Sequence, residues 1–195
     1  MTHLVATMVS MLALLGAVGM ANAGAATDVV KAKQTSLFEL IKDSNANKKK
    51  VTALFDEMLD YSALAEASLG TEWANRSDAE KAEFSELLKQ LVQKAYEKNL
   101  KKTLSFNIEY LGEETTGGAI VVKTKAVSKT NAREEPIEIN FKMLEKAGAW
   151  RVNDIVTEGV SLVSSYRSQF TKIIKKDGFP VLIKKMKDKI AKGDV

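Results

Sequence analysis

Four short stretches in the second half of the chain alternate apolar and polar residues: 104–110 (LSFNIEY), 120–126 (IVVKTKA), 137–143 (IEINFKM) and 150–154 (WRVND). Alternation of this kind is typical of a β-strand with one buried face and one wet face. Turn-forming residues at 112–118 and 146–148 and a longer loop at 128–136 separate the stretches. The sequence therefore predicts a four-stranded antiparallel meander with one apolar face.

Helical periodicity flanks the strands on both sides. Segments with helical spacing are residues 27–42, 50–60 and 63–69, the long segment opened by an S-x-x-E capping box at 77–80, the segment beyond Gly159, and residues 179–190. A capping box marks the first turn of a helix, because it satisfies two backbone N–H groups there. The predicted fold is α+β: a helical N-terminal half, a curved four-stranded antiparallel sheet, and C-terminal helices that close over its apolar face.

The first 23 residues differ from the rest of the chain, since they contain no Lys, Arg, Asp or Glu. An apolar run from Leu4 to Val18 precedes Ala21-Asn22-Ala23, which is typical of a secretory signal peptide. The run is shorter than the ~20 residues that span a bilayer. We predict cleavage after Ala23, with Ala25 as the second choice, and export to the periplasm. The absence of Lys and Arg before the run departs from the usual signal pattern.

Composition excludes several kinds of chemistry. The chain has no cysteine, and its only histidine is His3, within residues 1–23. Residues 24–195, which we predict to form one domain, therefore lack thiol nucleophiles, Ser-His-Asp triads and Cys or His metal ligands. Nucleotide-binding and hydrolase motifs are absent from the sequence, and the acidic pairs 113–114 and 134–135 fall in predicted turns. We accordingly predict no catalytic residue, no metal and no cofactor.

The chain carries a formal net charge of +4, and 25 of its 29 basic residues are lysine. Lysine is a strongly hydrated point charge, whereas arginine suits bidentate phosphate recognition. The pattern favours a solvated surface over nucleic-acid recognition, so no nucleic-acid partner is predicted. A weak attraction to anionic membrane surfaces stays open.

Two stretches resemble a known family. The first contains Leu69-Gly70, then Trp73, and a helix with Phe84 and Tyr96; the second contains Trp150, Val152, Asp154, Glu158-Gly159-Val160-Ser161-Leu162, Tyr166-Arg167 and Gln169-Phe170. Together they resemble the MlaC family, the periplasmic phospholipid-binding components of the Mla transport system, also described as toluene-tolerance or auxiliary ABC-transport proteins. The resemblance covers the order of elements along residues 24–195. Asp78 stands where the family commonly has proline.

The resemblance implies a monomeric lipid carrier with an apolar cavity between sheet and helices. Such a carrier would move phospholipid between an outer-membrane lipoprotein–porin complex and an inner-membrane ABC transporter, and so maintain outer-membrane lipid asymmetry. The residues expected to contact acyl chains are Phe106, Ile108, Val122, Ile139, Phe141 and Val152 on the apolar sheet face, with Tyr166 and Phe170 on the closing helix.

Two charged residues stand at the junction of the last strand and the closing helix. Asp154 follows the strand and Arg167 lies on the helix. The simplest interpretation is a structural ion pair. The alternative is that Arg167 contacts the lipid headgroup, because its guanidinium suits phosphate geometry.

Other functions remain open from the residues alone. An apolar strand face is ordinarily a packed core, so the fold could equally be a non-catalytic interaction module with a filled core that binds a partner protein. An enzyme with Ser-Lys or carboxylate chemistry is the third interpretation, and the shortage of histidine and cysteine disfavours it.

Overall fold

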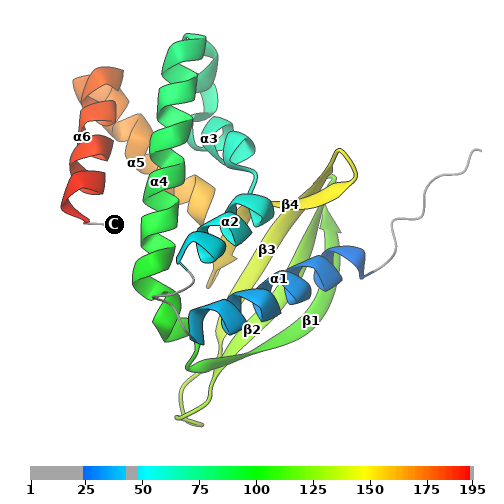
Figure 1. The fold of residues 1–195 in the computed structure, drawn as a ribbon. Coiled ribbons are helices and arrows are strands. Elements are labelled where there is room, and N and C mark those ends of the chain that lie inside the picture. The colour runs from blue at the N-terminus through cyan, green and yellow to red at the C-terminus, as the bar shows by residue number, and fades with distance from the viewer. Residues whose placement is uncertain (1–23, 43–47, 194–195) are drawn as a thin grey trace, which may run out of the picture.

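The computed structural model describes residues 24–42 and 48–193; the predicted signal peptide, residues 1–23, lies outside them. In chain order the elements are α1 (Ala25–Lys42), α2 (Lys48–Met58), α3 (Tyr61–Leu69), the 3-10 helix η1 (Gly70–Asn75), α4 (Asp78–Thr103), β1 (Phe106–Thr116), β2 (Ala119–Ser128), β3 (Ile137–Lys146), β4 (Ala149–Thr157), β5 (Val160–Ser161), α5 (Leu162–Asp177) and α6 (Phe179–Lys192). This order of helices, sheet and helices confirms the predicted α+β fold (Figure 1).

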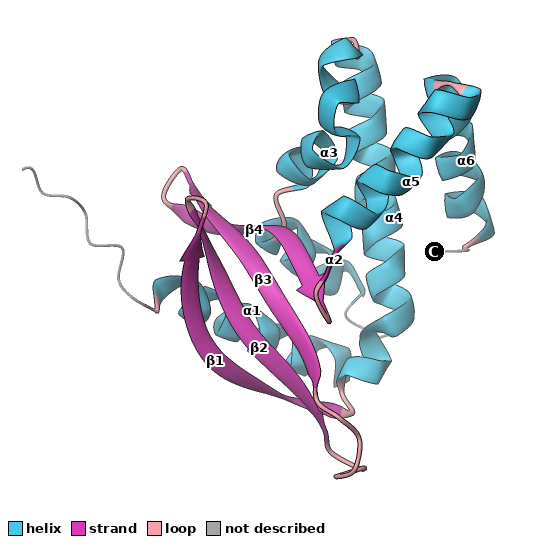
Figure 2. Cartoon of the chain, turned by 180° about the vertical axis from the view of Figure 1, so that it is seen from behind, coloured by secondary structure: helices cyan, strands magenta, loops and turns pink. Residues whose placement is uncertain are grey.

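The strands form one antiparallel sheet in the order β1-β2-β3-β4-β5, which confirms the predicted meander. The two-residue strand β5 is an addition, and it pairs with the end of β4. Glu158 and Gly159 between them both have positive φ, 50° and 76°, as a tight two-residue hairpin turn requires. Figure 2 shows a curved sheet with α1 and α2 behind it, so helices cover one of its faces.

The register of β1 against β2 shifts at Leu111, which is an extra residue on β1 and is left 53% exposed. Such a bulge reverses which residues face the helices. After it, Glu113 pairs with the fully buried Val122. The Glu113 carboxylate accepts hydrogen bonds from the backbone N–H groups of Gly24 (3.2 Å) and Thr27 (2.5 Å), at the start of α1. The bulge thereby joins the first helix to the edge strand.

A second register shift makes Asn153 an extra residue on β4, just before Asp154, which binds the start of α5. The Asp154 carboxylate accepts hydrogen bonds from the backbone N–H groups of Ile155 (2.9 Å) and Val163 (3.1 Å) and from the Ser161 hydroxyl (2.6 Å). Ser161 in turn caps α5 by accepting from the N–H of Ser164. One carboxylate therefore joins the last long strand to the first turn of α5.

The predicted ion pair between Asp154 and Arg167 is wrong. The start of α5 lies within reach of Asp154 and uses its carboxylate, whereas Arg167 lies further along the helix. Arg167 Nε donates to the carbonyl of Ala67, 2.7 Å away. Its side chain passes Gly70, where an added Cβ would stand 3.3 Å from Arg167 Cδ. Arg167 therefore joins α5 to the end of α3 rather than to the sheet.

The junction of α2 and α3 is attached to β4 at Val152, before the part of the strand that pairs with β5. Leu59 forms an isolated parallel bridge with Val152, and the N–H of Asp60 donates to the Val152 carbonyl at 2.9 Å. The Asp60 side chain caps α3 by accepting from the N–H of Ala63 (3.0 Å), and Lys146 Nζ lies 2.9 Å from the same carboxylate. Backbone pairing thus attaches the junction of both helices to β4.

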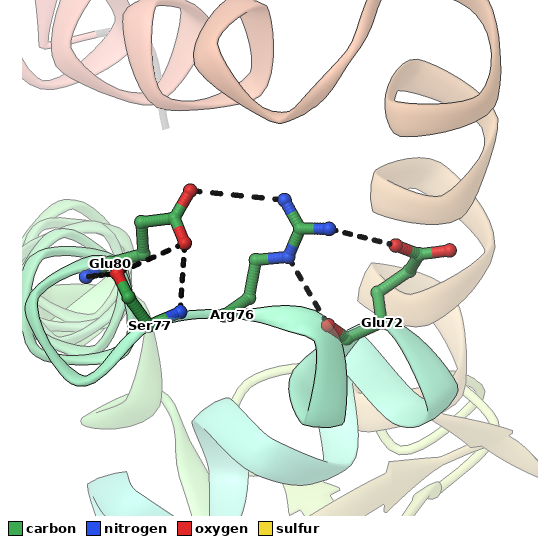
Figure 3. A network of polar contacts seen from close by, with 4 residues as sticks. All are labelled: Glu72, Arg76, Ser77 and Glu80. Atoms are coloured by element: carbon green, nitrogen blue, oxygen red, sulfur yellow. Dashed lines mark hydrogen bonds and ion pairs between the residues drawn. The ribbon is translucent and has the colours of Figure 1, made fainter.

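A polar cluster holds the helical layer together at the start of α4 (Figure 3). Ser77 and Glu80 form the predicted capping box, with hydrogen bonds in both directions. Arg76 lies between Glu72 (3.5 Å) and Glu80 (3.8 Å), and its guanidinium lies 4.8 Å from the centre of the Phe179 ring. The cluster therefore fixes η1, α4 and α6 relative to one another.

The cover over the sheet comes from both ends of the chain. The main helix–sheet contacts are those of α1 with β1 and β2, and those of α2, α3 and α5 with β4. The helix α6 instead packs against α4 and α5. The expectation that C-terminal helices close over the sheet therefore holds for α5, whereas the roof over β1 and β2 is the N-terminal helix α1.

Replacing Asp154 with alanine should lower the free energy of unfolding by about 2–4 kcal/mol, because three hydrogen bonds to a charged acceptor and a helix cap are lost. Arg167→Ala should cost about 1 kcal/mol, since it removes one hydrogen bond. Urea unfolding of both variants and of the double variant checks this. The two losses should add to within about 0.5 kcal/mol, because the residues share no contact. A larger coupling energy between the two substitutions would instead support an ion pair between Asp154 and Arg167.

Glu113→Gln should weaken the start of α1 in a pH-dependent way. Burial raises the pKa of the Glu113 carboxyl, but the backbone N–H groups at the start of α1 lower it more, so the net shift is downward from 4.5. A lowered pKa means that the stabilisation is present above about pH 4.5 and is lost as pH falls below it. The variant should lose about 0.5–1 kcal/mol at pH 7, the range of a partly exposed helix cap, and match the parent near pH 3.

The matched control for this change is Glu114→Gln, at the next residue of β1. Glu114 forms an ion pair with Lys123 on the surface, and among the described residues no hydrogen bond or ion pair joins it to α1. Denaturant titrations of both variants at the two pH values give the comparison. An equal pH dependence in the two variants would show that Glu113 has no special role in holding α1.

Candidate functional site

An apolar cavity of about 510 Å³ lies between the helices and the covered face of the sheet. Its lining residues are Gln34, Leu37 and Phe38 of α1, Phe55 and Met58 of α2, Ala95 and Tyr96 of α4, Ile108 of β1, Ile139 and Phe141 of β3, Ile155 and Thr157 of β4, Val160 of β5, and Leu162, Ser165 and Tyr166 of α5. Elements from the whole length of the described chain therefore meet around one space.

The cavity is open at the side of the β4–β5 turn. Val160 follows this turn, lines the cavity and is nonetheless 61% exposed, more than any other large apolar side chain of the described residues. At the opposite edge of the sheet, Tyr110 on β1 donates from its hydroxyl to Gln34 on α1 and so joins α1 to the sheet. An apolar wall that reaches solvent at one side can admit a long apolar ligand.

The lining carries no Asp, Glu, Lys or Arg among the described residues. Its ionisable members are two phenols. Burial raises the pKa of Tyr96, with a smaller contribution from Tyr166, and burial also raises the pKa of Tyr166. Both phenols are therefore neutral at physiological pH, and the cavity can hold uncharged apolar matter without stranding a charge.

The cavity walls are also stiffened by ring stacking. Phe55 stacks on Tyr96 with ring centres 4.3 Å apart, and Tyr166 stacks on Phe170 at 5.3 Å. Phe170 in turn meets the fully buried Phe84 edge to face at 5.5 Å. The aromatic residues therefore connect the cavity wall to the core of the helical layer.

Four of the eight residues predicted to face acyl chains line the cavity: Ile108, Ile139, Phe141 and Tyr166. The other four lie outside the lining. Val122 and Val152 are fully buried in the core, and Phe170 belongs to the aromatic cluster behind Tyr166. Phe106 is the first residue of β1, pairs with Ser128 and is not among the lining residues, although Ile108 two positions later is.

Arg167, the predicted headgroup residue, also lies outside the lining. Its side chain is engaged with the Ala67 carbonyl on α3. The residue one position earlier, Tyr166, faces the cavity instead, because neighbouring positions on a helix point about 100° apart.

Sequence reasoning missed the contribution of the N-terminal helices. Leu37, Phe38, Phe55 and Met58 belong to amphipathic faces that the sequence displays clearly, but a helical stripe alone does not distinguish a packed face from a cavity wall. Ile155 was missed for another reason. The extra residue at Asn153 brings Ile155 opposite Phe141, on the helix-covered face, and no local signal marks that shift.

The described residues contain no group of three His, Asp or Glu side chains placed to hold a metal ion. None of the helices in the described ranges is long and apolar enough to cross a membrane.

Comparison with known proteins agrees with this geometry. The family model described as "MlaC protein" matches residues 23–188. The chain belongs to the MlaC family. Among characterised members, the intermembrane phospholipid transport system binding protein MlaC of Haemophilus influenzae is 25% identical over 166 residues, 78% of each chain.

The MlaC fold is also found among solved structures. The phospholipid-binding protein of Ralstonia solanacearum, solved in complex with a phospholipid, superposes with a TM-score of 0.74. Its sequence is 20% identical, and the match covers 87% of this chain and 99% of that one. The likeness therefore covers most of the arrangement of sheet and helices.

Proposed function

We propose that this chain is a periplasmic carrier that holds phospholipid acyl chains in the cavity and moves them between membranes. The observation that carries the proposal is an uncharged apolar cavity of about 510 Å³ in a member of the MlaC family. The Haemophilus influenzae and Ralstonia solanacearum relatives, named for phospholipid transport and phospholipid binding, support it.

The energetics of the cargo fit a cavity of this kind. Each methylene moved out of water contributes about 0.8 kcal/mol, so a chain of about sixteen carbons contributes about 12 kcal/mol. A carrier must shield nearly all of that surface while it crosses an aqueous compartment. The lining residues are the ones we propose to contact the chains, among them Ile108, Ile139, Phe141 and Tyr166.

The volume suggests how much of a lipid the cavity holds. A protein cavity of about 150 Å³ binds benzene, which has six carbon atoms. The cavity of about 510 Å³ therefore corresponds to about twenty carbon atoms, roughly one full acyl chain. The second chain of a diacyl phospholipid would occupy the open side or widen the cavity. Movement of α1, which forms the roof over β1 and β2, is the simplest way to widen it.

The same proposal includes the transport route implied by the family. The carrier would work as a monomer, without catalysis or a cofactor, between an outer-membrane lipoprotein–porin complex and an inner-membrane ABC transporter. Its role would be to maintain the lipid asymmetry of the outer membrane. The alternative, an interaction module with a filled core, does not account for the volume left open between α1, α2 and the sheet.

Two tryptophan substitutions on neighbouring strands separate a carrier from a filled core. Ile139→Trp should fill cavity volume, so lipid is lost while the melting temperature of the delipidated protein stays unchanged. Val122→Trp should force a large ring into a fully buried site and cost about 1–3 kcal/mol, with lipid retained by the folded fraction. The measurements are native mass spectra of the purified proteins and thermal melts after delipidation.

The parent protein should carry an adduct of phospholipid mass in the native spectrum. A parent without any lipid adduct, or an Ile139→Trp variant that carries as much lipid as the parent, would refute the carrier. If instead Ile139→Trp melts as low as Val122→Trp, the space is ordinary core and the interaction module is the better interpretation.

The proposed export predicts a mature chain that begins at Gly24. The backbone nitrogen of Gly24 lies 3.2 Å from Glu113 Oε2, so cleavage after Ala23 would create a positive ammonium directly beside a carboxylate. That pair would hold α1 more firmly in the mature protein than in the precursor. N-terminal sequencing of protein from the periplasmic fraction checks the cleavage site; a sequence that starts at Met1 would contradict it.

A further inference from the structure

The positive charge of the chain is concentrated in its last two helices. Residues 172–192 hold eight of the 29 basic residues and only two of the 25 acidic ones. That segment therefore has a formal charge of +6, while the remainder of the chain sums to −2. A segregation of this size produces a local positive potential that the net charge of +4 understates.

All eight of these cations are lysines on the exposed side of one helical hairpin. Gly178 links α5 to α6, and the two helices pack against each other (Figure 1). The lysines are Lys172, Lys175 and Lys176 of α5 and Lys184, Lys185, Lys187, Lys189 and Lys192 of α6. Among the described residues, ion pairs engage only Lys185 with Asp177 and Lys187 with Glu83. Most of the charge is therefore available to a partner.

The α5–α6 hairpin exposes no large apolar side chain among the described residues. The apolar side of α6, with Phe179, Leu182, Ile183 and Met186, is buried within the helical layer. The exposed large apolar side chains of the described residues are Leu111, Leu144 and Val160, and none of them belongs to α5 or α6. A specific protein interface needs a desolvated core with aromatic or arginine anchors, and lysine is depleted from such interfaces. This surface has charge without anchors.

We propose that the lysine-rich side of the α5–α6 hairpin docks the protein on anionic phospholipid membrane surfaces. Dispersed lysines near such a surface attract it without insertion, and the attraction disappears within a Debye length. Contact of this kind is weak and reversible, which suits a protein that must leave one membrane for another. The first turns of α5 line the cavity with Leu162, Ser165 and Tyr166, so docking and cavity share one helix. The docking surface is inferred from the charge distribution, and its use in transport rests on the proposed carrier function.

Vesicle sedimentation tests the docking surface. The parent protein should sediment with vesicles of phosphatidylglycerol and phosphatidylcholine at low salt, and stay in solution with phosphatidylcholine alone. It should also dissociate at about 1 M NaCl, where the Debye length is about 3 Å. Acyl chains held in a dry cavity would show no such salt dependence.

Charge-neutralising variants locate the surface on the protein. The triple change Lys172→Gln, Lys184→Gln and Lys192→Gln should weaken partitioning onto the anionic vesicles about a hundredfold, or roughly fivefold for each lysine. The control is Lys49→Gln, Lys50→Gln and Lys125→Gln, three exposed lysines away from the hairpin with the same change in net charge. The control should bind within about twofold to threefold of the parent, because only the general field is reduced.

Melting temperatures and native mass spectra of both variants separate docking from folding and cargo. The hairpin variant should melt like the parent and carry the same lipid adduct, since it alters no cavity residue. Equal weakening of the two triple variants would overturn the proposal, as net charge alone would then explain binding. A parent protein that does not sediment with anionic vesicles at low salt would overturn the proposal too. An acidic protein would then be the better candidate for the partner of the hairpin.

Discussion

The helices of this protein are attached near the edges of the sheet, and a cavity is left between them and part of its apolar face. Three polar attachments impose this constraint. Glu113 on β1 holds the start of α1, the Leu59–Asp60 backbone pairs with Val152 on β4, and Asp154 at the end of β4 holds the start of α5. Each attachment uses directional hydrogen bonds, so each fixes a helix at a set place. The cavity exists because these positions hold the helices apart above Ile139 and Phe141.

Bulges make two of these attachments possible. An extra residue at Leu111 turns Glu113 toward the helices. An extra residue at Asn153 puts Val152 and Asp154 on opposite faces of the sheet, although they are two positions apart. Without them, strict alternation would direct Gly112 toward α1 and would leave its first N–H groups without a carboxylate. An open helix start costs stability, because those groups lack partners within the helix. The same irregularities that tie the helices down also select which side chains reach the cavity.

Charged side chains lie away from the cavity lining. Of the described residues, those that line the cavity include no carboxylate, ammonium or guanidinium, and its two phenols are held neutral by burial. Polar clusters such as Glu72–Arg76–Glu80 lie between helices at a distance from the cavity, and the lysines of α5 and α6 face solvent. An apolar ligand therefore meets only apolar and neutral groups, and the surface that carries the charge belongs to the far side of the helical layer.

The sequence by itself determined the four long strands, their order, the flanking helices and the capping box at Ser77, because alternation, helical spacing and capping residues are local signals. Half of the residues predicted to contact acyl chains line the cavity, among them Ile139 and Tyr166, which lie within regular stretches. Only the tertiary structure decided that Val122 is core while Ile139 is cavity wall, although both belong to the predicted apolar face on adjacent strands. It alone showed that Asp154 binds the start of α5 and not Arg167, and that α1 and α2 supply about a third of the lining residues. The reason is physical: local pattern specifies which face of an element is apolar, whereas the distance between two apolar faces depends on how distant parts of the chain are joined.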